Sequence, residues 1–558
     1  MRIRSLTACA VALAVVATAG LTGCSAGNQT VPGGDVALGT SNDINPQPRE
    51  ALRDGGNLRL ATTEFPPNWN TLSNDGNNLE IARIVWPMMP RAFITDAGGR
   101  LSVDPDYFTD VRLTGTEPQQ VTYTINPKAV WSDGTPITWE DIAAQANALS
   151  GRDKRYLIAV TSGFDRVEKV ERGVDDRQAI ITFKQHYAEW QGQFAGNSML
   201  FPKSVTGNPE SFNHGLVDHI TETAGPFRVR STDRTQGRIV LERNPKWWGE
   251  TPKLDTITVS VLDQAAWPAA LQNNELDAAQ LFSISDLATV RTAAGLTIRH
   301  APGTLWRHLT FNGSPGAILS DPKLRVAISK AIDRQTIVNA VSNGLENDPK
   351  PLGNHIYVRG QQGYRDNNPP FDPDAAAREL DALGWRLEGD VRVKDGRRLE
   401  IRDVMYNNDV WVKVAQIIQQ NLARIGVKLT IDARPGQNIF SDVFIPGDFD
   451  LAQFQWQGDA FPLSGVAQIY AYHPDDVQGN FGRIGSPELN ELIDKTLSEL
   501  DPQRAIELAN EVDRAVFEEG FSLPLTQDPG NYGVRADIAN FGAPGMASYD
   551  YTKIGFTK

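Results

Sequence analysis

The sequence predicts a mixed α/β protein that is divided into two or three folded units. Its 558 residues exceed what one hydrophobic core usually organises, so clefts between units are expected. From Leu58 onward, segments with the two-residue alternation of strands are interspersed with segments of helical periodicity. Hydrophobic residues make up 40% and charged residues 22% of the chain, the balance of a soluble globular protein rather than a disordered or membrane-spanning one.

A first strand-to-helix unit is predicted between residues 121 and 146. Residues 121–125 alternate as a half-buried strand does, and residues 131–136 (WSDGTP) have the composition of a turn. Thr138 is placed to begin a helix, because Asp141 stands three residues later and can complete a capping box. Apolar residues at the start of this helix form one face.

Further helices are predicted in the second half of the chain. Apolar residues recur at helical spacing from Trp411 to Ile425, Gly426 supplies a stop, and residues 427–431 alternate as a strand. Ser486 and Asp501 are each followed by proline and are predicted to begin two more helices. We assign the apolar faces of these helices to the core and attach no function to them.

Charge and motifs exclude several classes of function. The formal net charge is −14, and the chain has no basic stripe that would neutralise phosphates, so no nucleic-acid partner is expected. G-x-S-x-G, H-E-x-x-H and Gly-Lys phosphate-loop motifs are absent, and none of the seven histidines has the i, i+4 spacing of a helical metal site. We therefore predict no catalytic residue, metal or cofactor, although a hydrolase built from Ser, Asp and His residues that converge in space stays open.

The first 23 residues are predicted to be a cleaved signal peptide. Arg2 and Arg4 precede an apolar run that is too short for a settled transmembrane helix. The run ends in the sequence LTGC at residues 21–24, which resembles the bacterial lipobox and implies lipidation of Cys24. A structural Cys24 after an ordinary signal peptide is the alternative. The only other cysteine is Cys9, so the mature chain has no disulfide, and residues 24–54 have the Gly, Pro, Asn and Ser content of a flexible tether.

A series of segments gives the chain a family resemblance. In order along the chain they are residues 55–59 (GGNLR), 121–125 (VTYTI), 129–141 (AVWSDGTPITWED), 225–229 (GPFRV), 241–249 (LERNPKWWG), 274–278 (NELDA), 321–325 (DPKLR), 331–334 (AIDR), 449–451 (FDL) and 456–459 (WQGD). The chain resembles the extracellular solute-binding proteins of the dipeptide, oligopeptide and nickel class, family 5, which serve ABC importers. That family usually has glycine where Asn274 stands. These segments also read as turns and as the ends of strands and helices, so they need not touch a ligand.

The resemblance implies a two-lobed, periplasmic-binding-protein-like α/β fold with an extra inserted domain and hinge closure around ligand. Domain I would comprise residues 55–86, 222–300 and 528–558, domain II the insertion 87–221, and domain III residues 301–527. Ligand would lie between domains I and III. Contacts made from both lobes exist only in the closed state, so closure can report that the site is occupied.

The resemblance also implies the function. The protein would be a monomeric, extracytoplasmic lipoprotein, held on the outer face of the cell membrane through Cys24, that captures di- to oligopeptides for an ABC import permease. It would not be an enzyme. The alternatives are a nickel chelate, haem, a sugar or a small metabolite bound by the same fold, or a role in cell-envelope sensing.

Candidate ligand contacts follow from what a peptide needs in a closed cleft. Its ammonium, its carboxylate and its backbone groups must each find a partner. The resemblance implies that Asp459 pairs the ammonium while Trp456 adds an apolar wall, although residues 460–463 (AFPL) depart from the family pattern and Asp459 also fits a turn cap. For the backbone, the resemblance implies the loop Asn74, Asp75, Gly76, Asn77 and Asn78, because it stands where similar proteins contact the peptide; the alternative is an exposed turn. For the carboxylate, the candidates are Arg402, Arg359, His355 and Arg307, each of which is also compatible with a surface position.

Overall fold

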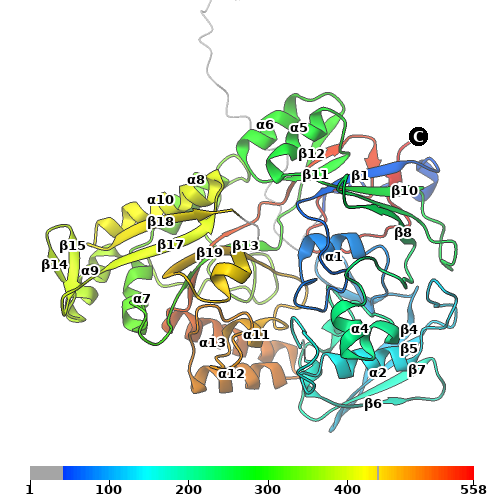
Figure 1. The fold of residues 1–558 in the computed structure, drawn as a ribbon, viewed down its shortest axis with the longest axis horizontal. Helices are drawn as coiled ribbons and strands as arrows, with labels where there is room; N and C mark the ends of the chain where they lie inside the picture. Colours follow the sequence, from blue (N-terminus) through cyan, green and yellow to red (C-terminus); the bar gives the residue numbers. More distant parts are fainter. Residues whose placement is uncertain (1–41, 162, 436–438) are drawn as a thin grey trace, which may run out of the picture.

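A computed structural model describes residues 42–161, 163–435 and 439–558. The predicted signal peptide, Cys24 and the first part of the predicted tether lie outside these residues. The chain forms three regions, each with its own main sheet, and Figure 1 shows the elongated C-terminal region extending away from the other two. We call them the N-terminal lobe, the inserted region and the C-terminal lobe. None of the helices in the described segments is long and apolar enough to cross a membrane.

The N-terminal lobe is built from segments that lie far apart in the sequence. Its four-stranded sheet has the order β1-β10-β9-β8, and a three-stranded sheet has the order β11-β21-β12. The strands are β1 (Asn57–Thr62), β8 (Phe227–Asp233), β9 (Arg238–Arg243), β10 (Thr256–Val261), β11 (Ala278–Leu281), β12 (Leu296–His300), β21 (Asn531–Arg535), β22 (Ile538–Ala539) and β23 (Gly555–Phe556). The helices are α1 (Leu79–Val85), α5 (Trp267–Gln272) and α6 (Ile284–Thr292), with the short helices η1 (Arg49–Ala51) and η4 (Gln264–Ala266).

The inserted region has an antiparallel sheet of order β4-β5-β7-β6 and a separate β2-β3 pair. Its strands are β2 (Phe93–Thr95), β3 (Leu101–Val103), β4 (Phe108–Thr116), β5 (Gln119–Ile125), β6 (Val167–Arg172) and β7 (Gln178–Phe183). Its helices are α2 (Trp139–Ala148), α3 (Lys203–Thr206), α4 (Pro209–His214) and the short η2 (Phe164–Arg166) and η3 (Trp190–Gly192). The predicted strand 121–125 lies in β5, and the capping box of Thr138 and Asp141 begins α2, so both predictions are confirmed.

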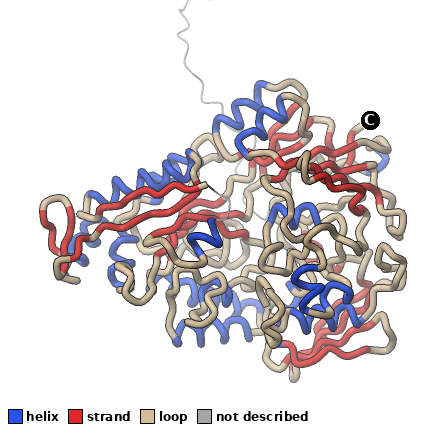
Figure 2. The backbone as a smooth tube through the Cα atoms, viewed as in Figure 1, coloured by secondary structure: helices blue, strands red, loops and turns tan. Residues whose placement is uncertain are grey.

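The C-terminal lobe is a five-stranded sheet of order β18-β17-β19-β13-β20 between layers of helices (Figures 1 and 2). Its strands are β13 (Leu305–Phe311), β17 (Glu400–Tyr406), β18 (Lys428–Arg434), β19 (Leu451–Gln457) and β20 (Ser522–Gln527), and a small sheet holds β14 (Arg386–Glu388), β15 (Val391–Lys394) and β16 (Arg397–Arg398). The helices are α7 (Pro322–Lys330), α8 (Arg334–Ser342), α9 (Pro373–Ala382), α10 (Asp409–Ala423), α11 (Val466–Tyr470), α12 (Pro487–Ser498), α13 (Pro502–Glu518) and the π-helical turn η5 (Phe440–Phe444).

The predicted helices of this lobe are confirmed. The helix predicted from Trp411 is α10, and β18 follows it as expected. Ser486 and Asp501 cap α12 and α13, because their side chains accept hydrogen bonds from the backbone amides of Leu489 and Arg504. The apolar face of α13 is buried along its length, as its periodicity requires.

The chain crosses between the two lobes through two linkers, residues 301–304 and 528–530. They pair with each other, since the amide of Gly303 donates to the carbonyl of Asp528 at 3.0 Å and that of Ala301 to Gly530 at 3.3 Å. Gly530 has a φ of +69°, and a Cβ there would lie 1.8 Å from the carbonyl oxygen of Ala301. Only glycine permits this close approach. The paired linkers form the connection about which the lobes can hinge.

Residues 42–54 correct the predicted extent of the tether. They belong to the folded body, because the amide of Asp43 bonds to the carbonyl of Ala543 at 2.9 Å and Leu52 is buried and bridged to Thr557. The partners come from the far end of the chain. Composition alone could not reveal them, since a Gly- and Pro-rich segment looks the same whether or not a distant strand covers it.

Candidate ligand-binding cleft

A cavity of about 170 Å³ lies beside the two linkers. Its walls come from all three regions: α1 and β21 of the N-terminal lobe, Gly196 and Asn197 of the inserted region, and the end of β19 in the C-terminal lobe. A hollow between lobes, next to their hinge, is where closure brings opposing side chains onto one ligand. We therefore take this cavity as the candidate cleft.

Asp459 lines this cavity from the loop that follows β19. Its Oδ1 accepts a hydrogen bond from the amide of Phe461 at 2.7 Å, so Asp459 caps its own turn while it lines the cavity. Burial raises the pKa of its carboxyl to about 6. Among the described residues no Lys, Arg or His side chain pairs with it. A buried carboxylate without a cation is costly unless a ligand supplies one.

Two guanidinium groups line the same cavity and were missed by the sequence prediction. Arg83, on α1, makes only long contacts, 3.4 Å to Gln280 and 3.5 Å to the hydroxyl of Tyr532. Arg91 stands at the start of the inserted region, and its buried Nε has no hydrogen-bond partner within the described chain. Neither pairs with a carboxylate in the part of the chain that the structure describes. Each can therefore offer donors to an anionic group on a ligand.

Polar and aromatic side chains complete the wall. Asp528, on the second linker, accepts from Nε2 of Gln280 at 2.5 Å and from the amide of Gly530 at 3.1 Å, and burial raises the pKa of its carboxyl. Trp86 lines the cavity, and its buried indole nitrogen has no acceptor among the described residues. A buried donor of this kind usually finds a partner, which a ligand carbonyl would provide. The remaining aromatic lining residues are Phe93, Phe461, Tyr532, Tyr549 and Tyr551.

Trp456 and the loop at residues 74–78 lie away from the cavity lining. Trp456, near the end of β19, stacks with His308 and with Phe481 at ring-centroid distances of 5.9 and 6.0 Å. In the loop, Asn78 caps α1 by accepting from the amide of Glu80, which positions the helix that carries Arg83. Gly76 is buried, whereas Asn74, Asp75, Asn77 and Asn78 are exposed.

The four residues predicted to receive the ligand's carboxylate are all engaged elsewhere. His355 is buried, with Nδ1 2.7 Å from Asp513 and Nε2 3.0 Å from the carbonyl of Ser522. Arg307 lies over the ring of Trp411 at 5.0 Å. Arg359 pairs with Glu346, and Arg402 pairs with Asp448 and Asp432. None of the four lines the cavity. The prediction rested on residue type alone, and packing within the C-terminal lobe decides where these side chains point.

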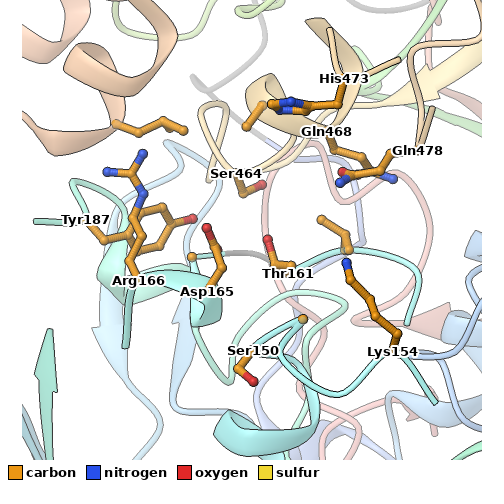
Figure 3. Close-up of a pocket in the computed structure, with 15 residues that line it drawn as sticks. Ser150, Lys154, Thr161, Asp165, Arg166, Tyr187, Ser464, Gln468, His473 and Gln478 are labelled. Carbon is orange, nitrogen blue, oxygen red and sulfur yellow. The ribbon is translucent and has the colours of Figure 1, made fainter. Parts of the chain in front are cut away.

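A second cavity, of about 250 Å³, separates the inserted region from the C-terminal lobe. Figure 3 shows Lys154, Thr161 and Asp165 on one side and Ser464 and His473 on the other. This cavity receives no side chain from the N-terminal lobe, so it lies apart from the cleft between the two lobes. Within the described ranges, no group of three or more His, Cys, Asp or Glu side chains is placed to hold a metal ion.

Comparisons with known proteins place the chain among binding proteins. A family model for bacterial extracellular solute-binding proteins, family 5 Middle, matches residues 112–476. The oligopeptide-binding protein OppA of Mycobacterium tuberculosis (strain H37Rv) is 54% identical over 545 residues, covering 96% of this chain and 92% of that protein. The structure of the periplasmic EDTA-binding protein EppA matches with a TM-score of 0.84 at 24% identity, over 94% of this chain and 100% of that one. The structure of AppA of Bacillus subtilis in complex with a nonapeptide matches with a TM-score of 0.79 at 18% identity. The match covers 91% of this chain and 100% of AppA. The predicted two-lobed fold is thereby confirmed.

Proposed function

We propose that this chain, which belongs to the family 5 bacterial extracellular solute-binding proteins, captures oligopeptides outside the cell membrane and delivers them to an ABC importer. Its 54% identity to an oligopeptide-binding protein extends over nearly the whole chain. The observation that carries the proposal is the charge pattern of the cleft. Asp459 faces it without an ion-pair partner, and Arg83 and Arg91 face it without a direct salt bridge among the described residues. The carboxylates of Asp528 and Asp104 act on these two guanidinium groups only at longer range.

This pattern is complementary to a peptide. The ligand's ammonium pairs with Asp459, and its carboxylate groups meet Arg83 and Arg91, so each charge finds a partner once water is excluded. Trp86 and Gln280 supply donors for backbone carbonyls. Tyr549 and Tyr551 add apolar surface that does not depend on one ligand side chain, which suits a range of peptide sequences.

A carboxylate-rich chelate is the second candidate, because two guanidinium groups also suit it and the structural relative EppA is an EDTA-binding protein. Asp459 opposes this alternative. Its carboxylate would repel a polyanion, whereas a peptide's ammonium relieves the charge. The cleft therefore fits a zwitterionic ligand better than a polyanionic one. An uncharged sugar is disfavoured for a different reason, because it would leave the Asp459 carboxylate without a cation.

Binding requires the lobes to separate. The cavity measures about 170 Å³, below the roughly 300 to 1,000 Å³ typical of ligand pockets. An oligopeptide therefore enters by opening at the linkers 301–304 and 528–530, and the lobes close on it afterwards. We divide the chain into a first lobe, an insertion and a second lobe at the boundaries that the sequence predicts, except that the first lobe begins at residue 42.

The protein acts outside the membrane as a monomeric lipoprotein and not as an enzyme. The predicted lipobox supports attachment through a lipid on Cys24, after cleavage of residues 1–23. The family description as extracellular supports the same location. The tether is then residues 24–41 or a part of them, because residue 42 onward belongs to the folded body.

The proposal is tested by purifying the full chain, releasing its bound small molecules and identifying them by mass spectrometry. We expect intact peptides of about two to ten residues, the range that the family resemblance implies, and calorimetric binding of synthetic peptides in the same range. Recovery of a metal chelate or a sugar, with no binding of peptides, would contradict peptide capture. Cleaved peptides would contradict a pure binding role.

A further inference from the structure

We infer that Glu189 is a positioning residue, which holds the ammonium-binding loop from across the molecule. The loop comprises residues 459–464 and belongs to the C-terminal lobe, whereas Glu189 belongs to the inserted region. The inference rests on the proposed function, because it gives Glu189 a role in orienting Asp459 toward a peptide's ammonium.

The contact is a hydrogen bond from loop backbone to side chain. Oε1 of Glu189 accepts from the amide of Leu463 at 2.9 Å. Since Leu463 follows Asp459 by four residues, this bond fixes the far end of the short loop that carries Asp459.

The middle of the loop also rests on the inserted region. A Cβ atom at Gly192 would lie 3.2 Å from the ring of Phe461, and one at Gly196 would lie 3.5 Å from Oδ2 of Asp459. The side chains of Phe461 and Asp459 therefore pack closely against the backbone at Gly192 and Gly196. The carbonyl of Phe461 in turn accepts from Oγ of Ser464 at 2.8 Å, which ties the two ends of this part of the loop together.

Neighbouring contacts form a seam that joins the two regions beside the second cavity. The amide of Ala188 donates to the carbonyl of Leu497 at 2.7 Å. Arg166, with its side chain only 7% exposed, pairs with Asp494 at 2.7 Å. Figure 3 shows Arg166 and Tyr187 of the inserted region with Ser464 of the loop nearby. Opening of this seam would remove every one of these contacts together.

The electrostatic environment of Glu189 is consistent with this role. Its second oxygen, Oε2, is buried and has no hydrogen-bond partner among the described residues. Burial raises the pKa of the Glu189 carboxyl well above its usual range, and the nearby Asp459 carboxylate raises it further. The other titratable groups near it are the hydroxyls of Tyr187 and Tyr357. Glu189 is thus suited to accept through Oε1 and adds little negative charge beside the ammonium site.

The consequence is a coupling between closure and recognition. The turn at Phe461 orients the Asp459 side chain, and the inserted region restrains the rest of the loop only while it lies against the C-terminal lobe. A ligand ammonium that pairs with Asp459 therefore favours the state in which Glu189 and Leu463 are joined. Recognition of the peptide's N-terminus would then stabilise the closed form that a permease receives.

The test compares Glu189→Ala with Glu189→Gln, which retains an acceptor oxygen, on a free-amine peptide and its N-acetylated counterpart. We expect E189A to bind the free-amine peptide about tenfold more weakly than wild type, the scale of one lost hydrogen bond. Binding of the acetylated peptide should change by less than about twofold, because that peptide does not use Asp459. The affinity of E189Q should stay within about threefold of the wild-type affinity for both peptides.

A ligand-free readout separates this inference from the proposed function. Hydrogen exchange of the segment 459–465, measured without peptide, should accelerate in E189A and stay unchanged in E189Q. This result stands whether or not the wild type binds peptides. Unchanged exchange in E189A, or an equal loss of both peptides, would overturn the positioning role, since the second outcome indicates a general effect on closure. If E189A does not fold, Glu189→Leu fills the same volume without an acceptor and takes its place.

Discussion

The amide of Phe461 donates to Oδ1 of Asp459 at 2.7 Å, while Oδ2 of the same carboxylate lies toward Gly196 at the cavity wall. One oxygen therefore fixes the side chain in its own turn, and the other stays available to a ligand. This preorganisation reduces the entropy lost when an ammonium binds. It also explains why Asp459 fits both sequence interpretations at once, as a turn cap and as a ligand contact.

The first prediction concerns the guanidinium groups of the cleft. Arg83→Met and Arg91→Met should each weaken binding of a short peptide with a free carboxylate by about 1.5 to 3 kcal/mol, the scale for hydrogen bonds to charged groups. Binding of the same peptide with an amidated C-terminus should be weakened much less by either substitution. Calorimetry with both peptides measures the difference.

Arg402→Met is the matched control, because its guanidinium already pairs with Asp448 and Asp432 outside the cavity. It should leave affinity within about twofold of wild type. An equal loss for free and amidated peptides in the Arg83 and Arg91 variants would show that these residues do not meet the carboxylate.

A second prediction concerns stability and pH. Burial raises the pKa of Asp403 to about 7, and its Oδ2 accepts from Nε2 of Gln453 at 2.6 Å. Because the folded pKa exceeds the unfolded value of about 3.9, the stability that Asp403 contributes is full below about pH 4 and is lost as the pH rises through 7.

Asp403→Asn removes this titration, and Oε1 of Gln453, which has no donor among the described residues, can accept from the new amide. We expect the variant to gain about 2 to 4 kcal/mol over wild type at pH 8 and little at pH 4, one pKa unit being about 1.4 kcal/mol. Thermal unfolding at both pH values measures this. Asp475→Asn, at an exposed site, is the control, and a gain of equal size at both pH values would reject the titration argument.

A third prediction tests the hinge. Gly530→Ala places a Cβ 1.8 Å from the carbonyl of Ala301 at a φ of +69°, so we expect a loss of more than about 2 kcal/mol of stability. Gly389→Ala has nearly the same φ, +67°, with nothing within 4 Å. It should lose only about 1 kcal/mol, the backbone strain alone. Chemical denaturation measures the free energy of unfolding of both variants. Losses of similar size would mean that the close contact between the linkers contributes nothing to stability.

A fourth prediction concerns the N-terminus. Cys24→Ser should abolish lipid incorporation and release much of the protein from the membrane fraction, because acyl chains supply the hydrophobic hold. Radiolabelled lipid and fractionation of cells measure both effects. Continued labelling of the variant would show that Cys24 is not the acceptor.

Local signals in the sequence were sufficient to predict helices and strands, but they were not sufficient to predict which residues line the cleft. Thr138 with Asp141, and Asp501 before a proline, specify helix starts through contacts within a few residues, and the structure has both. Arg83 and Arg91 belong to no motif, and they meet Asp459 only because the lobes bring them to one cavity. Arg402 has the right chemistry for a carboxylate, yet the pairing of β17 with β18 sets Asp432 beside it. Such nonlocal partners cannot be read from residue type.

The central claim is that Asp459 binds the ammonium of a peptide, and calorimetry of Asp459→Asn with matched free-amine and N-acetylated peptides tests it most directly. We expect the variant to bind the free-amine peptide more weakly than wild type by about 2 to 5 kcal/mol, the scale for breaking a buried charge pair. Acetylation should weaken binding to wild type by a similar amount and to the variant by much less. If the variant binds the free-amine peptide as tightly as wild type does, Asp459 is not the anchor and the account of the cleft is wrong.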